Sequence, residues 1–206
     1  DKAESRGLGD VYKRQGQLQV GTACVDVSPT VTPFQLRSGK SSYVHDPLHV
    51  RAVAFESGAG RAVICLIDAI GIGRDMSDTA KAKAAERTGW NAECMLICAT
   101  HTHTAPKGGE GMPGREEYEK LKYQKLEEAI VLAIESLEPA RVGFSSEDEP
   151  SEVRNRRWFL QPGTMPPNPL GELDQVGTNA NRNHLVSPAG PIDPEICIID
   201  VRTNRH

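Results

Sequence analysis

The sequence lacks several features that would place it in a common class of protein. No run approaches the ~20 consecutive apolar residues of a membrane-spanning helix, and the first residues contain no apolar core of a secretory signal. Basic residues are not in excess, because 24 Lys and Arg stand against 28 Asp and Glu and the net charge is −4. Nucleic-acid-binding proteins usually present a basic surface, so we expect no nucleic-acid partner and no transmembrane segment.

Aromatic residues and cysteines are also few. Four phenylalanines and two tryptophans give no obvious lipid-binding surface within this chain. The five cysteines are odd in number, and four of them lie in apolar, strand-like runs, which favours buried free thiols. Cys94 and Cys98 would be about 13 Å apart along an extended strand. We therefore do not expect them to share a metal ion.

The remaining composition, 38% hydrophobic over 206 residues, suits one globular domain or a large part of a bigger one. Residues 1–15 are polar and without pattern, and we expect a non-native or disordered leader, with residues 16–206 forming one partial domain. Alternation from Gln17 to Pro29 predicts a half-buried strand. Residues 49–56 and 61–68 predict two more strands, joined as a hairpin by the turn-rich SGAG.

Helix formers over residues 75–88 predict a helix ending at Gly89, and residues 94–100 predict another strand. Strand, helix and strand in this order imply a right-handed crossover between parallel strands. Apolar residues at helical spacing predict a second helix from Tyr118 to Leu137.

Residues 140–146 and 195–201 predict the last strands, while residues 147–193 contain mainly Pro, Gly, Asn and charged residues and predict an irregular stretch. The fold class expected is α/β, with a mixed, largely parallel sheet, flanking helices and an incomplete C-terminal end.

The residues with the clearest chemistry are His101 and His103, in the segment THTHTAP directly after a predicted strand. Ligands bind at the carboxyl edge of strands in open α/β sheets. Two imidazoles at i and i+2 of an extended segment point to the same side, where they can share a metal, or one can bind metal while the other handles a proton. The alternative is that one ring bonds Thr100 or caps the strand and the other is solvated.

Two further segments are candidates for the same edge. Asp68 ends the neighbouring strand and could bind metal, orient an imidazole or cap the next helix. His45, followed by Asp46 and a proline, favours a structural turn, and the functional alternative is that this loop lines the same cleft. Three arginines in VRNRRWF lie among acidic residues and form no basic face, but a single arginine could contact a substrate oxygen.

Taken in order, these segments resemble the neutral/alkaline non-lysosomal ceramidase family. The segments that resemble motifs of this family are VGTACVDVSP, YVHDPLHVRAVAFE, ATHTHTAP, LEPARVGF, VRNRRW and GPIDPEICIIDV. The resemblance covers residues 17–206, and the histidine motif is its most specific part.

The resemblance implies a catalytic domain that binds Zn²⁺ and hydrolyses the N-acyl bond of ceramide or a related N-acyl substrate. It implies that His101 is a zinc ligand, that His103 lies beside the metal as a ligand and catalytic group, and that Arg156 belongs to the catalytic site. Asp68, Asn155 and His45 are expected to bind substrate. The family's remaining ligands have no counterpart in this chain, so we expect the chain alone to be inactive. An extracellular or periplasmic location also follows from the family.

Two other functions remain open from the residues. One is a non-catalytic ligand-binding α/β domain. The other is hydrolysis without metal, in which His103 and Asp68 serve as acid and base.

Overall fold

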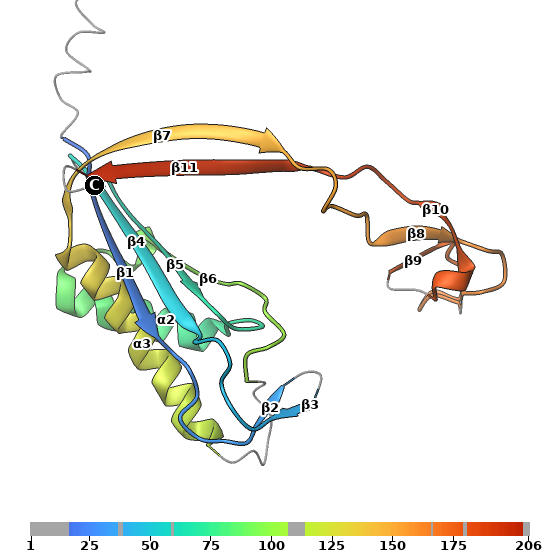
Figure 1. Cartoon of the computed structure of the whole chain (residues 1–206), viewed down its shortest axis with the longest axis horizontal. Helices are drawn as coiled ribbons and strands as arrows, with labels where there is room; N and C mark the ends of the chain where they lie inside the picture. The colour runs from blue at the N-terminus through green and yellow to red at the C-terminus, as the bar shows by residue number, and fades with distance from the viewer. Residues whose placement is uncertain are drawn as a thin grey trace, which may run out of the picture. The chain divides into compact units, whose positions relative to one another are not determined.

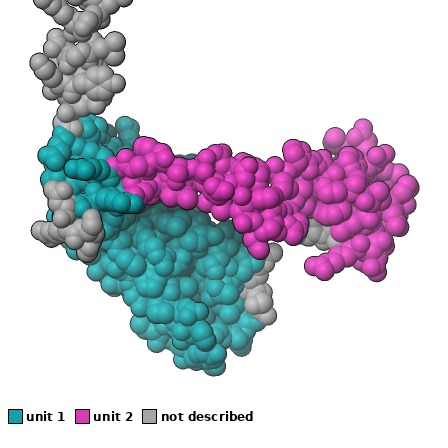
Figure 2. Space-filling view, turned by 45° about the horizontal axis from the view of Figure 1, so that its top comes forward, with its two compact units in different colours: residues 1–141, 201–206 teal, residues 142–200 magenta. Residues whose placement is uncertain are grey.

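The computed structural model describes residues 17–36, 39–58, 60–106, 114–165, 167–178 and 181–203. The leader expected over residues 1–15 lies outside this range. The chain divides into two compact units, unit 1 with residues 1–141 and 201–206 and unit 2 with residues 142–200 (Figure 2).

The main sheet has six strands (Figure 1). In spatial order they are Glu195–Thr203 (β11), Glu138–Asp148 (β7), Gln19–Asp26 (β1), His49–Ser57 (β4), Gly60–Ile67 (β5) and Met95–Ala99 (β6). A small antiparallel hairpin, Phe34–Leu36 (β2) and Gly39–Ser41 (β3), lies in the connection between β1 and β4.

The pairing of these strands confirms the mixed α/β class but not the parallel majority. Strand β1 is antiparallel to both β4 and β7, and β4 and β5 form the expected antiparallel hairpin. Strands β5 and β6 are parallel, as the crossover predicted. The expectation of a largely parallel sheet was wrong. Two consecutive strands can pair in parallel only if a long crossover connection joins them. Such a connection joins β5 to β6, whereas β5 begins too soon after β4 for one.

The two α-helices of the described residues are Arg74–Thr88 (α2) and Arg115–Glu135 (α3), close to the predicted ranges. Helix α2 has Asp75 in its first turn and Arg87 in its last, which suits the helix dipole. It ends at Gly89, whose φ of 71° lies in the left-handed region that favours glycine. None of the described helices is both long and apolar enough to cross a membrane.

Both helices cover the same face of the sheet, and the core lies between them and the strands (Figure 1). Alternate residues of β4 and β5 point into this core, together with one side of α3. The buried set includes Val50, Ala52, Ala54, Val63, Cys65, Ile67, Leu126, Ala129, Ile130 and Ala133. On the other face Ile64 and Leu96 stay exposed. The sheet is therefore packed on one side within unit 1.

The cysteines follow this two-sided pattern. Cys65 is buried in the core, whereas Cys24 and Cys197 are exposed, so the expectation of buried thiols was wrong for these two. Cys24 precedes the buried Val25 on β1 and thus points to the uncovered face. Within the described part of the chain, all five thiols are free.

Unit 2 corrects the prediction of an irregular stretch over residues 147–193. It contains a three-stranded antiparallel sheet formed by Arg157–Leu160 (β8), Val176–Thr178 (β9) and Leu185–Pro188 (β10). These strands have only three or four residues each, so alternation is too short to stand out among prolines and glycines.

Two short 3₁₀ helices, Ala92–Cys94 (η1) and Arg182–His184 (η2), precede β6 and β10 respectively.

Candidate functional site

The histidine motif lies where β5 and β6 end side by side. Because these strands are parallel and Ile67 is paired with Ala99, Asp68 and Thr100 leave the sheet at the same edge. The Thr100 N–H donates to the Ile67 carbonyl at 3.0 Å, which continues the ladder one residue beyond the strands. His101 therefore follows directly after the last bonded pair.

His101 combines an unusual backbone with a fixed ring. Its φ is 60°, in the left-handed region that residues with a Cβ rarely adopt. Its ring Nδ1 lies 2.6 Å from the carbonyl oxygen of Ile70. A carbonyl accepts only, so Nδ1 carries the proton and donates it, and in the neutral ring Nε2 keeps a lone pair. This arrangement is typical of histidines that bind a metal through Nε2.

His103 is the immediate neighbour of His101. The two ring centroids are 5.1 Å apart, with an angle of 66° between the ring planes. Both residues are exposed, and the hydroxyls of Thr102 and Thr104 are hydrogen-bonded to each other at 2.8 Å beside them. The structure thus brings together the two imidazoles that the sequence singled out.

Asp68 lies at the same edge, but its carboxylate is already in use. Oδ2 accepts the His49 N–H and the Arg51 Nη1–H, each at 2.9 Å. Burial alone would raise the pKa of Asp68, but these two donors and the Thr100 hydroxyl hold it below the ordinary value. Asp68 is a permanent anion at neutral pH and forms bonds to protein groups.

His49 and Arg51 also lie beside Asp68 at this edge of the sheet, and the sequence analysis did not single them out. Arg51 Nη2 lies 3.2 Å from His49 Nδ1 as well as bonding Asp68 through Nη1. The signal was present in HVRA, because alternation in a strand puts residues 49 and 51 on one face and the buried Val50 on the other. The same i, i+2 argument used for the histidine pair applies here.

His45 is exposed in the loop before β4, and its Nδ1 lies 3.1 Å from Asp46 Oδ2. Its loop borders a cavity of about 290 Å³ that is also lined by Thr104 of the histidine motif. Most of the other lining side chains are apolar: Pro29, Phe34, Leu36, Val44 and Leu48. The structure therefore brings the His45 loop next to the histidine motif across a small apolar cavity.

Tyr118, near the start of α3, carries a buried hydroxyl. Among the described residues this oxygen has no hydrogen-bond partner. Burial raises the pKa of the phenol, and the negative charges of Glu119, Asp68 and Asp26 add to the effect. The phenol is therefore neutral at physiological pH and lies within electrostatic range of the carboxylates at the sheet edge.

Unit 2 contains the other two predicted site residues. The Asn155 side chain is hydrogen-bonded at both ends, since its Nδ2–H donates to the Pro191 carbonyl and its Oδ1 accepts the Arg157 N–H, each at 2.9 Å. These bonds fix the turn that leads into β8. Arg156, next in the chain, is exposed, and no described residue is bonded to its guanidinium.

The residues present match part of a zinc site. Two imidazoles lie side by side, and the hydrogen bond of His101 sets the ring state that zinc needs. Within the described ranges, no group of three or more potential ligands comes together. His101 and His103 thus fit two positions of a zinc centre that requires at least one more protein ligand.

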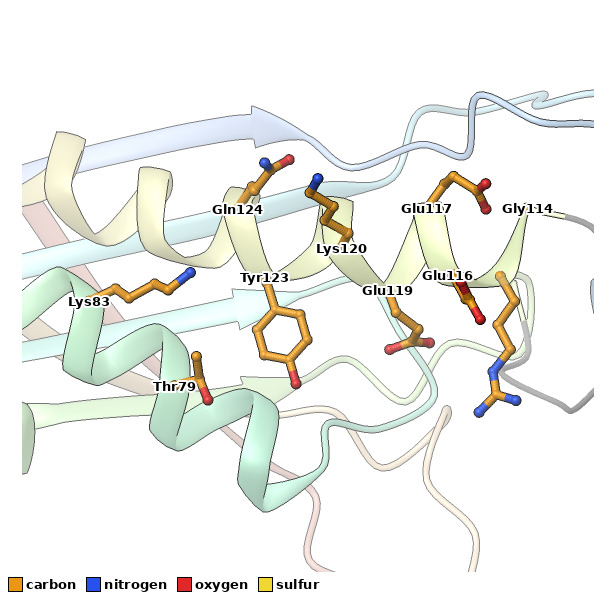
Figure 3. Close-up of a pocket in the computed structure, with 10 residues that line it drawn as sticks. Thr79, Lys83, Gly114, Glu116, Glu117, Glu119, Lys120, Tyr123 and Gln124 are labelled. Atoms are coloured by element: carbon orange, nitrogen blue, oxygen red, sulfur yellow. The ribbon is translucent and has the colours of Figure 1, made fainter.

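A larger hollow of about 940 Å³ lies between α2 and α3, away from the histidines (Figure 3). In Figure 3 the ring of Tyr123 points from α3 toward Thr79 of α2. The charged groups that line it are mixed, namely Lys83, Arg115, Lys120, Glu116, Glu117 and Glu119. This balance selects neither an anion nor a cation, so the hollow supports no functional assignment.

Two solved structures resemble the chain. One is neutral ceramidase from Pseudomonas aeruginosa, with a TM-score of 0.59 and 17% identity over 88% of this chain and 31% of that one. The other is a ceramidase complexed with C2, with a TM-score of 0.52 and 19% identity over 69% of this chain and 24% of that one. No family model and no curated protein matches. The chain thus spans less than a third of these ceramidases and shares the fold of that portion, as the resemblance predicted.

Proposed function

We propose that this chain is part of a zinc-dependent amide hydrolase that cleaves the N-acyl bond of ceramide or a related N-acyl substrate. The observation that carries the proposal is the ring of His101, whose Nδ1–H is bonded to the Ile70 carbonyl so that Nε2 can bind a metal. The fold shared with two ceramidase structures supports the choice of reaction.

In this proposal His101 would hold zinc through Nε2, and His103 lies beside the metal, where its ring can exchange a proton with the reacting groups. Zinc, when bound, supplies Lewis-acid polarisation of a carbonyl and lowers the pKa of a water. His103 takes up the proton released as water adds to the amide carbonyl. It then gives that proton to the departing amine nitrogen, which would otherwise leave as an unfavourable anion.

Two further residues bind the substrate in this proposal. Arg156, exposed beside the turn fixed by Asn155, donates hydrogen bonds to a substrate oxygen. His45 borders the apolar cavity of about 290 Å³ beside the histidine motif, which suits a hydrocarbon part of the substrate. Asp68 and Asn155 were expected to bind substrate too, but both side chains are hydrogen-bonded to protein groups.

We further propose an extracellular or periplasmic location for the protein, which cell fractionation tests.

The experiment is hydrolysis of N-acyl amides by the protein at its full native length, because the chain covers 31% of the ceramidase it resembles. We expect removal of zinc with a chelator to lower the rate at least ~100-fold, and added Zn²⁺ to restore it, because the metal supplies the main charge stabilisation.

Either competing function gives a different result. Hydrolysis that survives chelation would favour acid–base chemistry by His103 and Asp68, although the hydrogen bonds of Asp68 to Arg51 and His49 leave it a poor base. Binding of N-acyl amides without any hydrolysis would favour a non-catalytic binding domain.

A further inference from the structure

His101 is held by two segments of the neighbouring strand end. The Ile70 carbonyl accepts from its ring, and the Ile67 carbonyl accepts from the N–H of Thr100, the residue before it. Between these two carbonyls lies Asp68, whose carboxylate is near enough to the Thr100 hydroxyl for that hydroxyl to help lower its pKa. The segment 67–70 therefore holds Thr100 and His101 through two backbone carbonyls.

The backbone of His101 needs such support. A φ of 60° in a residue with a Cβ costs on the order of 1 kcal/mol or more, and it persists only where the surroundings enforce it. Without the bonds to Thr100, rotation of this backbone would move the imidazole away from the Ile70 carbonyl. The ring would then lose the contact that fixes its proton on Nδ1.

Asp68 is itself held in place. Its side chain is 17% exposed, and Arg51 balances its charge while the His49 N–H occupies the same oxygen. It does not cap α2, because the residue that precedes that helix is Gly73 and no side chain caps the helix start. Its contacts with His49 and Arg51 instead fix the segment 67–70, whose carbonyls hold Thr100 and the His101 ring, against β4.

We propose that Asp68 is a positioning residue for His101: its bonds to His49 and Arg51 and its proximity to the Thr100 hydroxyl fix the segment 67–70 against Thr100. This holds the left-handed backbone that directs Nδ1–H to the Ile70 carbonyl and presents Nε2. The effect on zinc binding rests on the proposed function above. The effect on the ring of His101 does not, since it concerns only groups of this chain.

The test compares two isosteric variants with a matched control. Asp68→Asn removes the charge, and Thr100→Val removes only the hydroxyl. Glu56→Gln disrupts an equivalent arginine–carboxylate pair at the other end of the same hairpin, where Arg61 Nε lies 2.8 Å from Glu56 Oε1. The carboxylates of Glu56 and Asp68 are similarly exposed, at 22% and 17%.

The readout is the tautomer of His101, measured by ¹H–¹⁵N NMR of ring nitrogens above about pH 7.5, where an ordinary imidazole is neutral. We expect a single Nδ1–H form in the wild type and in Glu56→Gln. In Asp68→Asn and Thr100→Val we expect a mixture with the Nε2–H form. A merely structural role would lower stability in all three variants without changing the tautomer.

Zinc affinity gives the second readout on the full-length protein. We expect Asp68→Asn and Thr100→Val to weaken zinc binding about 10- to 100-fold, as loss of a supporting partner does elsewhere, and Glu56→Gln to leave it unchanged. An unchanged His101 tautomer in both test variants would overturn the proposal. If the tautomer shifts in these variants but the wild-type protein binds no zinc, the proposed function is rejected and the positioning role is kept.

Discussion

At the residue scale, the polar groups near the histidine motif differ in the number of hydrogen bonds that they make. Asp68 accepts hydrogen bonds from His49 and Arg51, whereas the hydroxyl of Tyr118 is buried with no partner among the described residues. A buried hydroxyl that makes no hydrogen bond loses its hydration without compensation. A well-bonded carboxylate at the edge of the sheet and a costly phenol on α3 therefore lie within electrostatic range of each other.

This difference predicts the effect of Tyr118→Phe. Removing an unbonded buried hydroxyl should raise the free energy of unfolding by about 1 kcal/mol, because only its desolvation penalty is lost. Denaturant unfolding measures the change. Tyr123→Phe, on a less buried tyrosine of the same helix, is the control and should have little effect. A loss of stability in Tyr118→Phe would show that its hydroxyl makes a hydrogen bond in solution.

At the scale of elements, the position of α3 on the sheet depends on a glycine in β1. A Cβ placed on Gly21 would lie 2.0 Å from the Ala133 carbonyl oxygen and 2.8 Å from the Leu137 N. These are backbone atoms, which cannot rotate away as a side chain can. The C-terminal end of α3 thus packs directly against the strand backbone, and the buried side of the helix meets the sheet there.

Gly21→Ala should therefore force the helix and strand apart. We expect a loss of about 2 kcal/mol or more in the free energy of unfolding, the usual cost of overpacking a core. Gly143→Ala in β7 is the matched control, since the nearest atom to its added Cβ is Asp200 Cβ at 4.0 Å. Equal stability of the two variants would contradict the close contact of α3 with β1.

At the scale of the whole molecule, the elements that could be predicted are those with long periodic patterns. Helices α2 and α3 and the hairpin of β4 and β5 follow from spacing and turn residues, and so does the parallel step from β5 to β6. The placement of Asp68 and His101 at one edge follows from that parallel step alone. The proximity of the His45 loop to the motif was one of two open alternatives in the sequence, because it depends on the path of residues 27–48.

Other features depend on contacts between distant segments, which one sequence does not reveal. The antiparallel pairing of β1 with β4 and β7 depends on which strands come together in space. The three short strands of unit 2 carry too few residues for a pattern. The left-handed backbone of His101 and its bond to Ile70 arise from tertiary packing, and Arg51 gained its role only through its contact with Asp68.

The most direct test of the account is the zinc content of the full-length protein, measured by elemental analysis for the wild type, His101→Ala and a control, His184→Ala. His184 lies in unit 2, outside the histidine motif. We predict about one zinc per chain in the wild type and the control, because a catalytic zinc site binds a single ion, and little in His101→Ala. Absence of metal from the wild type, or full retention in His101→Ala, would contradict the assignment of His101 as a zinc ligand.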